Sequence, residues 1–299
     1  MAPGTLFVVA TPIGNLDDMT PRAVETLQAV DLIAAEDTRH SKPMLRRFGV
    51  ERPLVSYHDF NEDRRAPGLL DALEAGKNVA LICDAGTPCV SDPGYAVVRA
   101  AHGRGYRVVA VPGASALTAA LSVSGMPCEP AVFHGFFPRR TSAFSALWKR
   151  MRAFGGTHVF FESPRRVAKT LGLLAQTAPG VEVCAARELS KVYENIVMGP
   201  VEEVLGRCGE HGPAEEEAGP LMPEKGEFVL LVNLGAPVKE APSLDTAAIR
   251  ARVEAVMAAE GLSRRDAVRH VAKTLDLPRN EVYAAAAGDG PSARPDGGR

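Results

Sequence analysis

Four short segments of the chain combine glycine or proline with acidic, hydroxyl or basic side chains. Each follows an apolar run with the length of a β-strand, and glycine lets a backbone approach a ligand closely and expose its N–H groups. One such segment is as typical of a simple tight turn as of a ligand site. Four at the carboxyl ends of strands favour a shared ligand site. The segments are Thr11–Leu16, Glu36–Arg39, Asp84–Pro88 and Pro112–Ala116.

The sequence lacks the motifs of several common enzyme chemistries. No GxGxxG follows the first apolar run, and GxxxxGK[ST] occurs nowhere, which argues against hydride transfer and nucleoside triphosphate hydrolysis. The five cysteines include no CxxC pair, so we expect reduced thiols, with neither a disulfide framework nor a metal site.

The segments must be positioned by alternating strands and helices. In an N-terminal domain, residues 1–124, apolar runs alternate with helical patterns, which predicts a mainly parallel α/β sheet. A second α/β domain is expected over residues 125–236, and its last two strands at Asn195–Met198 and Glu227–Asn233. Between these strands Gly209–Glu224 is predicted to be a mobile surface loop.

A small helical tail domain is predicted over residues 243–287, with Ala-rich amphipathic helices at Thr246–Glu260, Ser263–Leu275 and Pro278–Ala287. Ser263, followed by Asp266, is a typical N-cap. The last residues, Gly288–Arg299, are expected to be disordered.

Composition narrows the class of protein. The 299 residues are 46% hydrophobic and 23% charged, as in a soluble globular protein, with a formal net charge of −2. The most apolar stretch, Val108–Met126, is interrupted by Pro112 and Gly113, and no run reaches the roughly 20 residues that span a bilayer. We therefore expect a cytoplasmic protein without a membrane partner.

The chain closely resembles the ribosomal RNA small subunit methyltransferase I family, over about residues 5–235 and in its tail. The motifs that carry the resemblance are Phe7–Leu16, Ala35–Ser41, Ser56–His58 with Asn61 and Glu62, Asp84–Pro88 with Ser91–Gly94, Pro112–Ala116, Phe161–Arg166, Arg187–Lys191 with Glu194, and Lys225–Glu227.

The resemblance implies a tetrapyrrole-methylase-like, class III methyltransferase fold of two α/β domains, with S-adenosylmethionine between them. It also implies a homodimer that 2′-O-methylates a cytidine ribose in the decoding centre of 16S rRNA, with the small ribosomal subunit as the setting. The first loop, Thr11–Leu16, departs from the GxGxGD-like loop of tetrapyrrole enzymes and is similar to that of the rRNA branch.

The matching motifs also suggest site residues. The cofactor is expected to contact Pro12, Ile13, Gly14, Asp84, Thr87, Gly113, Ser115 and Ala116. A ribose hydroxyl is a poor nucleophile, so a general base is useful; the candidates are Glu36, Asp37, His58 and Glu188. The cluster of Glu36, Asp37 and Arg39 is favoured, with Arg39 or Lys191 holding a phosphate or lowering the hydroxyl pKa. Asp84 and Asp92 are also candidates for hydroxyl or cation recognition.

Phosphate neutralisation dominates RNA binding, so basic pairs are candidate contacts, although each pair alone is more typical of a solvated surface. They are Arg46–Arg47, Arg139–Arg140, Lys149 with Arg150 and Arg152, and Arg165–Arg166. Phe136, Phe137 and Tyr57 could stack on an extruded base, although packing in the core is the commoner role of a Phe. The basic tail residues Arg264, Arg265, Arg269 and Lys273 could add an RNA or a dimer contact.

Two other functions remain open. A tetrapyrrole C-methyltransferase would need a large apolar trough and no basic face, and the first loop and the arginine pairs argue against it. A non-enzymatic RNA-binding or ribosome-assembly protein would leave the four ligand loops without a purpose.

Overall fold

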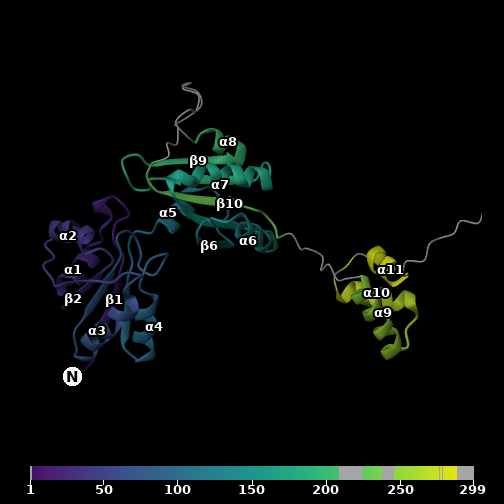
Figure 1. Ribbon diagram of the computed structural model, residues 1–299, viewed down its shortest axis with the longest axis horizontal. Coiled ribbons are helices and arrows are strands. Elements are labelled where there is room, and N and C mark those ends of the chain that lie inside the picture. Colours follow the sequence, from purple (N-terminus) through teal and green to yellow (C-terminus); the bar gives the residue numbers. More distant parts are fainter. Residues whose placement is uncertain (1, 209–224, 238–245, 276, 278, 288–299) are drawn as a thin grey trace, which may run out of the picture. The chain divides into compact units, whose positions relative to one another are not determined.

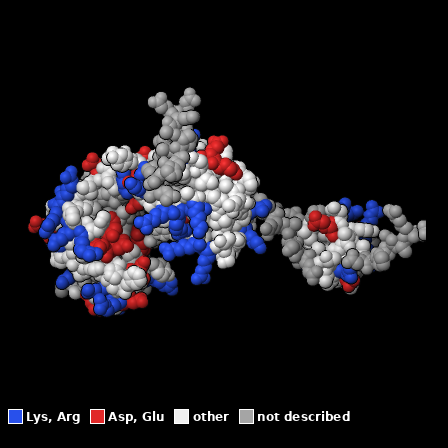
Figure 2. Space-filling model, turned by 45° about the horizontal axis from the view of Figure 1, so that its top comes forward, with Lys and Arg blue, Asp and Glu red and all other residues white. Residues whose placement is uncertain are grey.

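The computed structural model describes residues 2–208, 225–237, 246–275, 277 and 279–287 (Figure 1). The chain divides into two compact units, Met1–Pro237 and Val238–Arg299, and each is described by itself below. Lys, Arg, Asp and Glu side chains are visible on the surface of both units (Figure 2). The predicted loop Gly209–Glu224 and the end Gly288–Arg299 lie outside the described residues. No described helix is long and apolar enough to cross a membrane.

The first sheet is entirely parallel, as the alternation of strands and helices predicts. Its order is β3 (Leu54–Ser56), β2 (Leu32–Ala35), β4 (Val79–Ile82), β1 (Thr5–Val9) and β5 (Arg107–Val111). The four segments with candidate ligand chemistry follow β2, β4, β1 and β5, which are consecutive neighbours. They therefore meet at one edge of the sheet.

Helices cover both faces of this sheet (Figure 1). Helices α1 (Pro21–Ala29) and α2 (Thr38–Arg47) pack on one face, around a core that includes Leu27, Ile33 and Leu45. Helices α3 (Glu62–Glu74) and α4 (Tyr95–Gly103) pack on the other. The Thr20 hydroxyl caps α1, which has Pro21 in its first turn, a position where its missing N–H costs nothing.

The second sheet is mixed. Its order is β6 (Ala131–Phe136), β7 (Thr157–Glu162), β10 (Phe228–Asn233), β8 (Glu182–Arg187) and β9 (Asn195–Pro200). Only β6 and β7 are parallel; the other neighbours are antiparallel. The predicted strands at Asn195–Met198 and Glu227–Asn233 are confirmed as β9 and β10.

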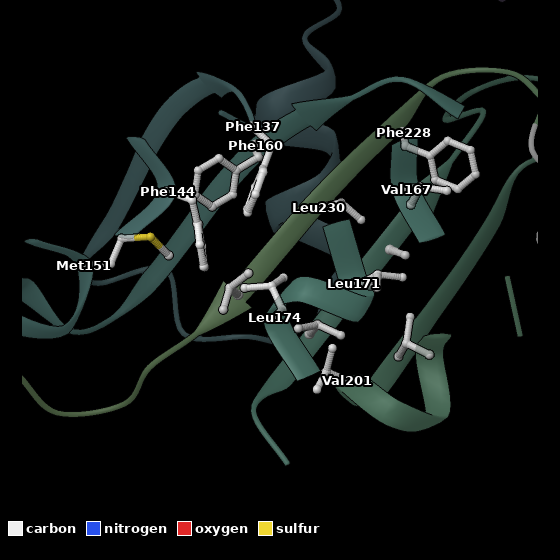
Figure 3. Close-up of a cluster of buried hydrophobic side chains, with 14 of the residues drawn as sticks. Phe137, Phe144, Met151, Phe160, Val167, Leu171, Leu174, Val201, Phe228 and Leu230 are labelled. Carbon is white, nitrogen blue, oxygen red and sulfur yellow. The ribbon is translucent and has the colours of Figure 1, made fainter. Parts of the chain in front are cut away.

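The core of the second sheet lies under three helices, α6 (Thr141–Phe154), α7 (Pro164–Thr177) and α8 (Val201–Gly206). Figure 3 shows Phe144 of α6, Phe160 of β7 and Phe137, which follows β6, gathered beside the aliphatic side chains of α7. Alternate residues of β10 point the other way, because successive side chains of a strand leave opposite faces.

The opposite face of the second sheet joins the two halves of this unit. Helix α5 (Ala116–Val123) contacts β10, and a buried apolar cluster combines Ala120 and the loop residue Ile13 with Val159 and Leu231 of the sheet. The fold is thus the expected α/β arrangement with two sheets. The division at residue 124 stays a prediction, since both sheets belong to one compact unit.

The second unit contains α9 (Thr246–Glu260), α10 (Arg264–Thr274) and α11 (Arg279–Ala287), which share a small core that includes Val253, Val271 and Val282. The hydroxyl of Ser263 accepts a hydrogen bond from the N–H of Asp266, so the predicted N-cap is confirmed.

Candidate functional site

Hydrogen bonds tie the loops after β1, β4 and β5 together. The N–H of Thr11 donates to the carbonyl of Gly86 at 2.8 Å, and the N–H of Gly86 donates back to Thr11 at 3.1 Å. The Thr87 hydroxyl donates to the carbonyl of Ala114 at 3.2 Å. Gly86 has a φ of 85°, a conformation that glycine adopts at little cost. The three loops therefore form one continuous backbone surface.

The loop after β2 is joined to this surface by carboxylates. The N–H of Asp84 donates to the Glu36 carboxylate at 3.2 Å, and the N–H of Asp37 donates to the Asp84 carboxylate at 3.0 Å. Each loop thus supplies both a donor and an acceptor to the other. All four predicted loops are brought together.

A pocket lies between these loops and the second sheet. The loops contribute Ile13, Ala85, Gly86, Thr87, Val90, Ser91, Asp92, Ser115 and Ala116, and the second sheet contributes Phe136, Phe161, Glu162, Glu227, Phe228 and Val229. Apolar groups dominate the lining. Its three charged residues are all carboxylates, and no Lys or Arg lines it.

Only one of these three carboxylates lacks a cationic partner among the residues that the structure describes. Arg166 pairs with Glu162 at 3.2 Å, and Lys191 pairs with Glu227 at 3.0 Å. Asp92 has no such pair. Burial, with the nearby charges of Glu36 and Asp84, raises its pKa to about 6.

A neighbouring hollow is lined by Pro12, Ile13, Gly14, Asp84, Lys191 and Glu227, together with residues of α2. The Lys191 ammonium lies 2.9 Å from Glu188 and 3.0 Å from Glu227. The Lys191 stem lies against Gly14, where an added Cβ would overlap it. Burial alone would lower the pKa of Lys191, but the hydrogen bonds to the two carboxylates more than offset this, so its pKa is raised.

Asp37 and Arg39 are paired with each other at the start of α2. Asp37 caps the helix by accepting from the N–H of Arg39, and its carboxylate also binds the Arg39 guanidinium at 2.8 Å. The side-chain hydrogen bond from Arg39 lowers the pKa of Asp37 to about 2. The Arg39 side chain is 90% exposed. By contrast, burial raises the pKa of Glu36.

The predicted site residues therefore fall into groups. Ile13, Thr87, Ser115 and Ala116 line the main pocket, and Pro12, Gly14, Asp84 and Lys191 line the neighbouring hollow. Gly113 lines a third, more open depression, shared with Ile13 and Ser115. Glu36, Asp37 and Arg39 line none of the three. Glu36 and Asp37 each contact Asp84, which lines the neighbouring hollow.

The three candidate stacking aromatics differ in exposure. Phe136 is 60% exposed and lines the main pocket, whereas Phe137 and Tyr57 are buried in the two cores. Phe136 is therefore the one of the three that a base could reach.

Sequence reasoning missed the wall that the second sheet supplies, made of Phe161, Glu227, Phe228 and Val229. Two of its segments lie in motifs of the family resemblance, Phe161–Arg166 and Lys225–Glu227, which is the signal that could have indicated them.

Comparison with known proteins identifies the family. The model of the family described as Tetrapyrrole (Corrin/Porphyrin) Methylases matches residues 5–205. Ribosomal RNA small subunit methyltransferase I of Synechocystis sp. is 42% identical over 282 residues, which cover 94% of this chain and 96% of that protein. The proteins of the same description from Escherichia coli O157:H7 and Bacillus subtilis are 40% and 36% identical, each over 94% of this chain and over 93% and 94% of their own length. The chain belongs to the ribosomal RNA small subunit methyltransferase I family.

Solved structures share the fold at low identity. Diphthine synthase superposes with a TM-score of 0.56 at 14% identity, over 77% of this chain and 90% of that one. Uroporphyrin-III-C-methyltransferase from Thermus thermophilus gives 0.51 at 17%, over 77% and 94%. The methyltransferase I family thus has the tetrapyrrole methylase fold, as predicted, and the predicted enzyme class is confirmed.

Proposed function

We propose that this protein transfers a methyl group from S-adenosylmethionine to the 2′-hydroxyl of a cytidine ribose in the decoding centre of 16S rRNA. The observation that carries the proposal is the main pocket. Its walls are apolar, loops that contain glycine and proline line it, and its Asp92 carboxylate has no cationic partner among the described residues. S-adenosylmethionine carries a sulfonium and an ammonium, and a pocket with a free carboxylate and no Lys or Arg suits such a cation. A nucleotide phosphate would be repelled there.

The bound cofactor would supply a methyl group on a sulfonium, an already activated leaving group. The task left to the chain is alignment. The backbone of the loops at Ile13, Thr87, Ser115 and Ala116 would hold the ligand, as would Pro12, Gly14, Asp84 and Gly113. The tied loops suit this role because their hydrogen bonds to one another fix the positions of the remaining N–H groups.

A proton must leave the ribose hydroxyl, and Glu36 and Asp92 are the better acceptors. A general base works best when its pKa lies near the working pH, and the pKa of both carboxyls is raised. The low pKa of Asp37 makes it a weak base and suits it to holding Arg39. Arg39 and Lys191 would place the RNA, Arg39 from solvent and Lys191 from the hollow beside Gly14.

The RNA would approach over basic side chains outside the pocket. Figure 2 shows Lys and Arg side chains in several groups on the first unit, one of them next to a group of acidic side chains. The exposed candidates are Arg46, Arg47, Arg139, Arg140, Lys149, Arg150, Arg152 and Arg165. Arg166 has a structural task instead, because it pairs with Glu162 and donates to the carbonyl of Phe137 at 2.6 Å.

The working protein would be a cytoplasmic homodimer acting on 16S rRNA within the small ribosomal subunit. Two-fold dimers are the commonest assemblies of soluble proteins. Light scattering at micromolar concentration should give twice the chain mass, and a monomer mass would contradict this part of the proposal.

Two measurements test the function. Calorimetry with S-adenosylmethionine should show binding at one site per chain, and absence of binding would favour the RNA-assembly alternative. Mapping of 2′-O-methylation in 16S rRNA from a deletion strain should show the loss of one cytidine modification, restored by the wild-type chain. Intact rRNA methylation, with methyl transfer to a tetrapyrrole instead, would overturn the proposal.

A further inference from the structure

The helical unit of α9–α11 has a hollow of unusual composition. Its lining consists of Arg264, Arg265, Val268, Arg269, Arg279 and Tyr283. Four guanidinium groups thus surround one depression, and none of its lining residues is acidic. The two arginines at the start of α10 come from one element and Arg279 comes from another, so the fold of the unit brings them together.

These arginines are not used to hold the unit together. All four are exposed, and among the described residues their one ion pair joins Arg269 to Asp266 at 3.7 Å, with both side chains about half exposed. Such a pair contributes little. Arg250 is different, because its side chain donates to the carbonyl of Ala285 and so links α9 to α11. The four arginines of the hollow have no comparable bond to a described residue.

The charge of this part of the chain differs from that of the whole. Residues 246–287 contain seven Lys and Arg against five Asp and Glu, whereas the full chain has a net charge of −2. Like charges held around one hollow repel each other, and an anion that enters the hollow removes this repulsion. Arginine also presents paired N–H groups that match two oxygens of a phosphate.

Tyr283 adds a second kind of contact. Its side chain is 58% exposed at the same hollow. An exposed aromatic ring beside phosphate-binding arginines is the combination that binds unpaired nucleotides, with the ring stacking on a base. A polyanion without bases would make no use of it.

We infer that the Arg264–Arg265–Arg269–Arg279 hollow of the tail unit is a docking site for the phosphate backbone of an unpaired RNA segment. The inference rests on the proposed function for its choice of RNA as the polyanion. In this role the tail contributes affinity and leaves the methyl transfer itself to the pocket of the first unit.

The test compares two full-length double variants of equal charge. Arg265→Gln with Arg279→Gln removes two charges from the hollow, and Arg104→Gln with Arg252→Gln removes two exposed charges outside it. The probe is a transcript of the decoding-centre region of 16S rRNA, titrated at several salt concentrations. The hollow variant should bind at least about tenfold more weakly, and its log–log salt slope should fall by about two ions. The control should change by less than about threefold, and both should bind S-adenosylmethionine as the wild type does.

A third variant, Tyr283→Leu, separates stacking from charge: it should weaken binding without changing the salt slope. Circular dichroism melts of each variant establish that the tail is folded.

Unchanged RNA affinity in the hollow variant, or an equal loss in the control, would overturn the inference. A change from dimer to monomer mass in the hollow variant would assign the hollow to a dimer contact instead. Failure of the proposed function is a separate result, visible in the wild type as absence of methyl transfer to the transcript or to small subunits.

Discussion

Gly86 has a left-handed backbone conformation and also lines the main pocket. It is buried, its φ is 85°, and an added Cβ would lie 3.3 Å from the Ile13 side chain. Gly86→Ala should weaken S-adenosylmethionine binding by about tenfold or more, since about 1.4 kcal/mol suffices. Calorimetry measures this.

The matched control is Gly105→Ala. Gly105 has a similar φ of 72°, but an added Cβ meets nothing within 4 Å. Both variants should lose about 1 kcal/mol of stability from the left-handed backbone, and only Gly86→Ala should lose cofactor affinity. Equal affinities in the two variants would place the cofactor elsewhere.

Asp92 gives the stability of the protein a definite pH dependence. Its pKa is about 6 in the folded chain and near 4 when unfolded. The folded state therefore holds more protons at this carboxyl between these values, so the contribution of Asp92 to the free energy of unfolding should fall as pH rises from about 4 to about 6. Asp92→Asn cannot ionise, so it should lose this slope and be more stable than the wild type at pH 7.

Urea unfolding between pH 4 and pH 7.5 checks this prediction. Asp71→Asn, which changes an exposed carboxyl on α3, serves as the control and should keep the wild-type slope. The same slope in Asp92→Asn would show that another group causes it.

At this scale the sequence indicates the composition of the site better than the orientation of its side chains. The four loops are evident from glycine, proline and polar residues after apolar runs. The pairing of Asp37 with Arg39 depends on a local helix cap, and the free carboxylate of Asp92 depends on which cations its neighbours already hold. Packing between segments far apart in the chain determines these side-chain contacts.

At the scale of elements, the turn between β8 and β9 fastens the two sheets. The hydroxyl of its Ser190 donates to Asp18, which follows β1, and Lys191 lies against Gly14 while it bridges Glu188 and Glu227. Lys191→Met should leave the half-buried Glu188 without its cation. We expect a loss of about 1–2 kcal/mol, between the values for exposed and for buried pairs.

Arg39→Met is the control for this loss. It breaks an ion pair in which the Arg39 side chain is 90% exposed, so unfolding by urea should change by less than about 0.5 kcal/mol. An equally small loss in Lys191→Met would mean that the turn is held by its backbone alone.

Elements in the first half of the chain could be predicted closely, because each strand alternates with a helix and parallel pairing follows from that alternation. The second sheet could not be ordered in this way. Strands β7, β8 and β10 are buried on both faces and read only as apolar runs, which fit parallel and antiparallel neighbours equally. Strand β10 lies between β7 and β8 although it follows both in sequence, a placement that only long-range contacts decide.

At the scale of the whole molecule, the two compact units should act independently in cofactor binding. All residues of the three pockets at the loops belong to Met1–Pro237, which contains the cores of both sheets. A chain truncated after Pro237 should therefore bind S-adenosylmethionine with an affinity within about threefold of the full chain, as measured by calorimetry. A loss of binding in a truncated chain that still melts cooperatively would show that the tail contributes to the pocket.

Ile13 serves at once as a wall of the main pocket and as a member of the buried cluster that joins α5 to the second sheet. We therefore expect a ligand to enter through local movement of the loops, because swinging the sheets apart as rigid halves would expose this cluster to water. The same residue limits which fragments of the chain could keep the pocket. A fragment that contains only the first five strands would carry most of the candidate ligand loops but leave an apolar face without its cover. We therefore expect the pocket to form only in a chain that contains both sheets.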